Sequence, residues 1–233
     1  MFDQSVAFAL AAVAIYGLTQ VIAKAAVGSL DAPTMVAMNF LVSIPIYVFL
    51  LACSLVMYGE YLEHMEYVAY GLIGASTARG GYYIYLEALE TGSVTMVGSI
   101  TAAFPAITVA LAVTLLGESL RLVNAIGIVL IIGGMVGLSY SHGRANGSKS
   151  MSRLSLILSV TTLLVWGVGG VFIKMALDEL PLIAYLGLYP FILPPVAYAY
   201  LRHQRVTRAG RFPKWAVPGS GALVVAELWQ MGS

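Results

Sequence analysis

The stretch TMVAMNFLVSIPIYVFLLACSLVM, Thr34 to Met57, decides the fold class because it contains no charged side chain. About 20 mostly apolar residues are enough for an α-helix to cross a hydrocarbon core of about 30 Å. The whole chain has the same character. It is 60% hydrophobic and 10% charged, against roughly 25% charged in soluble domains, and its mean hydropathy is +0.88. We therefore predict an all-α polytopic membrane protein surrounded by a lipid bilayer.

Dividing the chain into apolar runs of about 17 to 25 residues predicts eight transmembrane helices. Only short polar connections separate most of them, which leaves no room for a soluble domain. The predicted spans are Val6 to Val27, Thr34 to Met57, Tyr67 to Ala88, Val94 to Leu116, Val123 to Tyr140, Leu154 to Leu177, Leu182 to Leu201 and Trp215 to Met231.

The loop charges indicate an orientation in the cytoplasmic membrane. On the face that holds the amino terminus and loops 2-3, 4-5 and 6-7, Arg121 is the only basic residue among several acids. Loops 5-6 and 7-8 carry eight basic residues: Arg144, Lys149, Arg153, Arg202, Arg205, Arg208, Arg211 and Lys214. By the positive-inside rule these two loops are cytoplasmic and the amino terminus is outside. This explains the basic run without a nucleic-acid partner, and the net charge of only +1 indicates none.

An internal repeat is visible when the chain is aligned with itself at an offset of 150 residues. YGLTQVIAKAA, from Tyr16, then lies over WGVGGVFIKMA, from Trp166, and Lys24 meets Lys174 without a gap. Five spans precede the second copy, and an odd number forces the two copies into opposite orientations. This predicts inverted five-helix repeats, an architecture of secondary transporters.

The repeat also sets the domain boundaries. We expect a first five-helix repeat at 1–141, a cytoplasmic linker at 142–153, and a second repeat at 154–233 that is incomplete, with three helices. About eight of an expected ten transmembrane helices are therefore present. A C-terminally truncated chain is the favoured interpretation, and a natural eight-helix protein is the alternative.

Several motifs resemble the EamA family of the drug/metabolite transporter superfamily. They are YLEALETGS at 85–93, FPAITVALAVTLLGESL at 104–120 with its mid-span proline and closing Leu-Gly-Glu, the glycine-rich segment that follows, and the two aromatic-Gly and Lys segments of the repeat. The resemblance implies a ten-helix transporter that moves small metabolites or drugs, often outward, by alternating access. It also implies a cytoplasmic amino terminus, which the loop charges contradict, and we keep the orientation from the charges.

Arg79 is the most informative polar residue because it lies near the middle of the third span, where a charge costs at least about 2.5 to 3.5 kcal/mol. On a helix, Tyr83 and Glu90 share its face. Such a stripe could bind an anionic or carboxylate-bearing solute through the guanidinium group. Alternatively Arg79 pairs with Glu227, which occupies the equivalent depth in the second repeat. Such a pair could be purely structural, or it could form a substrate or proton-coupling site. A coupling proton or a counter-solute is thus a possible partner of the transporter.

Other polar and aromatic residues have weaker signals. Lys24 and Lys174 near helix ends fit dipole complementation and snorkelling, with a gating or ligand role as an open alternative. Tyr16 and Trp166 fit packing or cavity lining. Glu118, after the fourth span, is disfavoured by the helix dipole, so we expect a partner, either Arg121 nearby or the start of the fifth helix.

The sequence indicates a transporter and not an enzyme. The three histidines fall in loops or at span ends, and no metal-binding, phosphate-loop or nucleophile motif is present, so we expect no catalytic residue, metal or cofactor. Gly133 and Gly137 form a GxxxG pair that favours packing within the chain over a homodimer, which stays open. A membrane assembly or scaffold protein is the competing function, but it gives no reason for a charge in mid-membrane.

Overall fold

The computed structural model describes residues 14–15, 17–19, 21–26, 30–59, 64–120, 122, 125–130, 132–134, 137 and 152–204. Throughout these residues the regular structure is helical. The chain divides into two units, Met65–Glu179 and the combination of Met1–His64 with Leu180–Ser233. Four segments are long and apolar enough to cross a membrane: Ala32–Tyr58, Val94–Leu115, Arg153–Leu177 and Leu182–Gln204. The protein is thus built from membrane-spanning helices, as the composition predicts.

The first unit contains α3, Met65–Thr91, α4, Val94–Thr101, α5, Phe104–Leu115, and α7, Arg153–Leu177. The side chain of Ser93 accepts a hydrogen bond from the backbone N–H of Met96 at the start of α4, and Ser152 does the same for Ser155 at the start of α7. These side chains satisfy backbone donors that a helix leaves open at its N-terminus.

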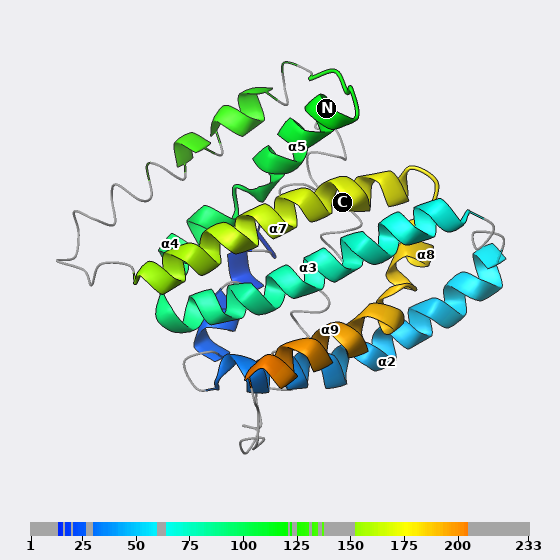
Figure 1. Ribbon diagram of the computed structural model, residues 1–233, viewed down its shortest axis with the longest axis horizontal. Helices are drawn as coiled ribbons and strands as arrows, with labels where there is room; N and C mark the ends of the chain where they lie inside the picture. Colours follow the sequence, from blue (N-terminus) through cyan, green and yellow to red (C-terminus); the bar gives the residue numbers. More distant parts are fainter. Residues whose placement is uncertain are drawn as a thin grey trace. The chain divides into compact units, whose positions relative to one another are not determined.

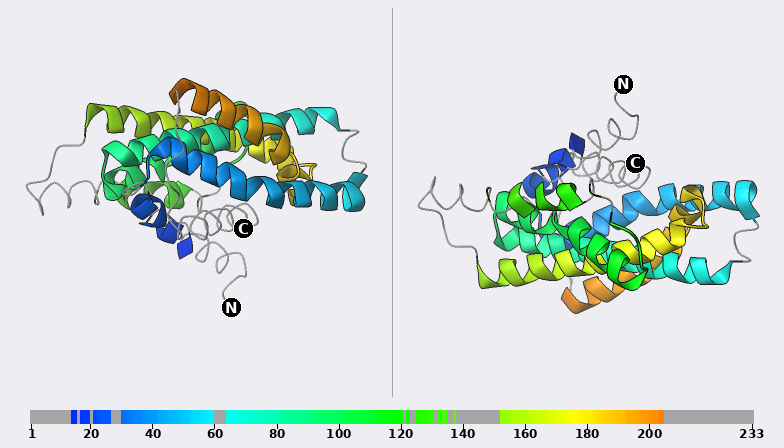
Figure 2. Two further views of the ribbon diagram at one scale, coloured as in Figure 1. Left: turned by 90° about the horizontal axis from the view of Figure 1, so that it is seen from below. Right: turned by 90° about the horizontal axis from the view of Figure 1, so that it is seen from above.

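The antiparallel helices α3 and α7 form the main contact of this unit and lie side by side in Figure 1, and Figure 2 shows the helices from two other directions. Ser155 near the start of α7 donates a hydrogen bond to the carbonyl of Ala88 near the end of α3, at 3.0 Å. At the opposite end, Phe172 lies against Tyr70, with ring centroids 6.4 Å apart. Both α4 and α5 also pack on α7, so α7 is the central helix of the unit.

The predicted fourth span is interrupted in its middle. Instead of one helix, α4 ends at Thr101 and α5 begins at Phe104. Pro105 lacks an N–H and therefore cannot continue the hydrogen-bond ladder of α4, and the N–H of Ala106 bonds to the carbonyl of Ala103, three residues back. The predicted bend at this proline is therefore a break between two short helices.

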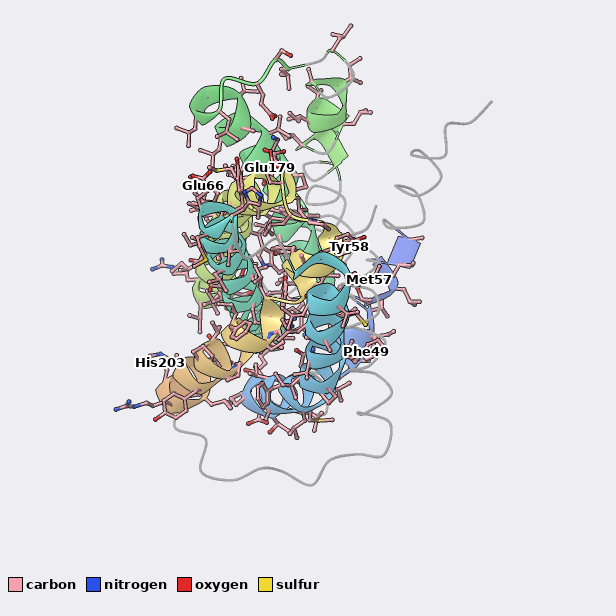
Figure 3. The ribbon with its side chains drawn as sticks, turned by 90° about the vertical axis from the view of Figure 1, so that its right-hand side faces the viewer. Phe49, Met57, Tyr58, Glu66, Glu179 and His203 are labelled. Atoms are coloured by element: carbon pink, nitrogen blue, oxygen red, sulfur yellow. The ribbon has the colours of Figure 1, made fainter. Side chains whose placement is uncertain are left out.

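The second unit contains α2, Ala32–Tyr58, α8, Leu182–Leu186, and α9, Tyr189–Gln204. α2 and α9 run antiparallel (Figure 1), and the rings of Tyr47 and Tyr189 stack between them with centroids 4.6 Å apart. The side chains of Phe49, Met57 and Tyr58, labelled along α2 in Figure 3, are exposed, which suits a helix surface against lipid. The predicted seventh span is divided into α8 and α9 by a turn at Gly187.

The first and fifth predicted spans are described only in part, and the eighth lies outside the described residues.

Candidate functional site

Arg79 is buried in the middle of α3, with only 2% of its surface exposed. Its guanidinium carbon lies 5.8 Å from the ring centroid of Tyr82, one turn along the helix. A desolvated cation over a tyrosine face gains on the order of 2 kcal/mol, which offsets much of the 2.5 to 3.5 kcal/mol that the charge costs at mid-membrane. The prediction that Arg79 faces protein and not lipid agrees with this burial.

An aromatic cluster lies beside Arg79, on three different helices. Trp166 of α7 packs against Tyr85 of α3 and Phe104 at the start of α5, with centroids 5.7 Å apart in both pairs. Tyr82 stacks near Tyr85 at 6.3 Å. Phe104 follows directly on the break between α4 and α5. The arginine, the aromatic cluster and an interrupted helix thus occur together.

Trp166 also joins α7 to α3 by a hydrogen bond. Its indole N–H donates to the carbonyl of Ala78, at 3.0 Å, one residue before Arg79. The ring can approach this closely because residue 81 is glycine, where an added Cβ would lie 2.5 Å from Trp166 Cδ1 and Nε1. Trp166 therefore packs between helices, which is one of the two roles expected from the sequence, and its role in lining a cavity stays a prediction.

The glycines of WGVGG let α7 approach its neighbours closely. A Cβ at Gly167 would lie 2.5 Å from Ile107 of α5, and one at Gly169 would overlap Thr77 of α3. The hydroxyl of Thr108 donates to the carbonyl of Gly167 at 2.9 Å. Small residues of this kind are what helix packing inside a membrane requires. The motif therefore holds α3, α5 and α7 around the aromatic cluster.

Charged residues meet at the other end of α7. Lys174 Nζ lies 2.6 Å from Oε1 of Glu118, which follows α5, and 3.4 Å from Oδ2 of Asp178. Glu66 and Glu179 lie at this end as well (Figure 3), close enough to interact electrostatically with Tyr67. Glu118 thus has a partner, as expected, but the structure pairs it with Lys174, which the sequence did not indicate. Arg121 lies outside the described residues.

The remaining predicted site residues are placed as follows. Tyr83 is 1% exposed and lies on the same side of α3 as Arg79, whereas Glu90 is exposed near the end of that helix. Lys24 is half-buried in the described part of the first span. Tyr16 and Glu227 are outside the described residues, so the predicted pairing of Glu227 with Arg79 stays a prediction.

Sequence reasoning missed Tyr82, Tyr85 and Phe104 as neighbours of Arg79. Tyr82 had a usable signal, because a residue three positions along a helix is a neighbour of the first. The contacts of Phe104 and Tyr85 with Trp166 join segments far apart in sequence, and no spacing reveals them. Within the described residues, no three His, Cys, Asp or Glu side chains are grouped so that they could hold a metal ion.

Comparison with known proteins identifies the family. A search of curated proteins gives no match. The model of the EamA-like transporter family matches residues 4–140, from the first predicted span through the broken helix and the Leu-Gly-Glu motif. Because this match covers more than half of the chain, the protein belongs to the EamA-like transporter family of the drug/metabolite transporter superfamily.

Proposed function

We propose that the protein is a secondary transporter that moves small metabolites or drugs across the cytoplasmic membrane by alternating access, as an exporter or exchanger. The single observation that carries this proposal is the buried Arg79 beside an aromatic cluster and a broken membrane helix. Broken helices expose backbone groups at mid-membrane, where transporters bind their solutes. An intramembrane charge is expensive and marks a functional site by default.

The solute class follows from the side chains at this site. The guanidinium of Arg79 presents a planar set of donors that matches a carboxylate or another anion. Tyr83 and Trp166 contribute aromatic surface, and we assign Glu90 and Tyr16 to the same solute path from their sequence positions. Arg79 binds the anionic group in this proposal, and the aromatic residues hold the rest of the solute.

The inverted repeat is supported by α2 and α9. The three buried residues of α9, which are spaced by four, correspond at the 150-residue offset of the repeat to three of the buried residues of α2: Tyr189, Leu193 and Ala197 on α9, and Asn39, Ser43 and Tyr47 on α2. Two equivalent helices that pack antiparallel against each other are what a two-fold axis in the membrane plane requires. We therefore keep the predicted repeats, 1–141 and 154–233, with the cytoplasmic linker at 142–153.

The same architecture motivates a pair between Arg79 and Glu227 across the pseudo-symmetry axis. If the pair opens during transport, Glu227 can exchange a proton, which would couple solute movement to a proton gradient. The meeting of Glu118 and Asp178 at Lys174 supports the placement of loops 4-5 and 6-7 on one face. The loop charges assign this face, and with it the amino terminus, to the outside.

Flux in reconstituted vesicles tests the function. Vesicles holding the full chain are screened with carboxylate-bearing solutes, and Arg79→Gln and Arg79→Lys are compared with Arg202→Gln, which alters an exposed arginine at the end of α9. We expect Arg79→Gln to abolish carboxylate flux, Arg79→Lys to retain a fraction because the charge remains, and Arg202→Gln to transport normally. Full activity of Arg79→Gln would refute the assigned role. Absence of flux for every solute would favour the scaffold function.

A further inference from the structure

Lys174 has two acidic partners that belong to different parts of the chain. Glu118 follows α5 in the first predicted repeat, and its Oε1 lies 2.6 Å from Lys174 Nζ. Asp178 lies one turn after Lys174 on its own chain segment, with Oδ2 at 3.4 Å. One contact ties α5 to α7, while the other stays within the end of α7.

The local backbone explains why Glu118 reaches Lys174. Gly117 has a φ of 69°, in the left-handed region that favours glycine. The N–H groups of Leu116 and Glu118 both point to the carbonyl of Ala112, at 3.0 and 3.4 Å, so the chain turns back at the end of α5 as in common helix C-terminal caps. The Leu-Gly-Glu motif is thus a cap that directs its acid toward α7.

The pair can open at little cost. The side chains of Lys174 and Glu118 are 37% and 40% exposed, and exposed ion pairs shift an equilibrium by a factor of about five at most. When Glu118 leaves, the ammonium group keeps Asp178 as a partner, and the exposed Glu118 carboxylate is solvated by water. The release of one of two partners suits a contact that must form and break in every cycle.

We propose that Lys174, Glu118 and Asp178 form a latch that closes the seam between α5 and α7 at this end of the transporter and opens when Lys174 releases Glu118 and keeps Asp178. The proposal rests on the alternating-access function and assigns one of its moving contacts. It distinguishes the two acids by their effect: Glu118 stabilises the closed seam, and Asp178 stabilises the open one.

Cysteine labelling tests the latch without any solute. Thr108 lies in the seam, where its hydroxyl bonds to the carbonyl of Gly167, and Thr108→Cys in a Cys53→Ser background provides a single reactive thiol for a membrane-impermeant maleimide. We expect Glu118→Gln to raise the labelling rate about three- to fivefold, and Asp178→Asn to lower it.

Two further variants keep the result specific. Thr114→Cys, on the exposed side of α5, should label at the same rate in every background. The double variant Glu118→Lys with Lys174→Glu exchanges the two charges. In this background Thr108→Cys should be labelled more slowly than in the Glu118→Gln background. Equal rates in all backgrounds, or a change in the same direction for Glu118→Gln and Asp178→Asn, would overturn the latch. Because labelling needs no solute, a failed flux assay leaves this test intact.

Discussion

Gly81→Ala should destabilise the protein, whereas the same substitution at the neighbouring Gly80 should not. An added Cβ at Gly81 would lie 2.5 Å from the rigid indole of Trp166, and at Gly80 it would meet nothing within 4 Å. Overpacking costs about 1 to 3 kcal/mol, and losing the Trp166 hydrogen bond to Ala78 adds about 0.6 kcal/mol in a membrane. Replacing glycine with alanine stabilises the helix by about 1 kcal/mol at either position, so this contribution cancels when the two variants are compared.

The expected difference in unfolding free energy between the two variants is therefore about 2 to 4 kcal/mol. Thermal unfolding in detergent micelles measures it as a melting temperature on the order of 5 to 10 °C lower for Gly81→Ala than for Gly80→Ala. Adding Trp166→Phe, which shortens the ring that the Cβ meets, should reduce the effect of Gly81→Ala by at least half. Equal melting temperatures for the two alanine variants would refute the close packing of α3 on Trp166.

Three other substitutions test separate contacts by the same unfolding measurement. Gly117→Ala places a side chain at a φ of 69° and should lower the free energy of unfolding by about 1 to 2 kcal/mol. Gly117→Asn should lower it less, and equal losses for the two variants would contradict the left-handed cap. Tyr47→Leu should destabilise by roughly 0.5 to 1.5 kcal/mol through the lost ring stacking, whereas Tyr198→Leu, at a side chain 64% exposed, should have little effect. Ser155→Ala removes the hydrogen bond to the Ala88 carbonyl and should cost about 0.6 kcal/mol. No change there would show that the α3 and α7 ends do not depend on this bond.

The burial of Arg79 could be predicted from sequence because the free energy of a charge in hydrocarbon leaves few places for it. The helical character and approximate ends of α2, α3 and α7 followed from apolar run length for a similar reason. These predictions depend on how individual side chains interact with lipid and water, and composition and periodicity reveal such interactions directly.

The contacts of the site were harder to predict because they join distant segments. Glu118 has Arg121 close by in sequence, yet its partner is Lys174 at the end of another helix. Pro105 indicated a bend, but whether a proline bends or breaks a helix depends on neighbours such as Trp166, which packs on Phe104. In α2, Pro45 lies within a continuous helix. Tertiary packing decides between these outcomes, and sequence spacing does not record it.

The pairing of α3 with α7 has a consequence for biogenesis. α3 is as long as α2 and α7 but less apolar than either, and it carries Arg79 at its centre and acids toward its ends. Its partner α7 is synthesised only after more than sixty further residues. We therefore expect α3 to leave the translocon poorly retained by lipid and to become stably integrated once α7 arrives, so that ribosome-bound chains ending before α7 should leave α3 accessible to water.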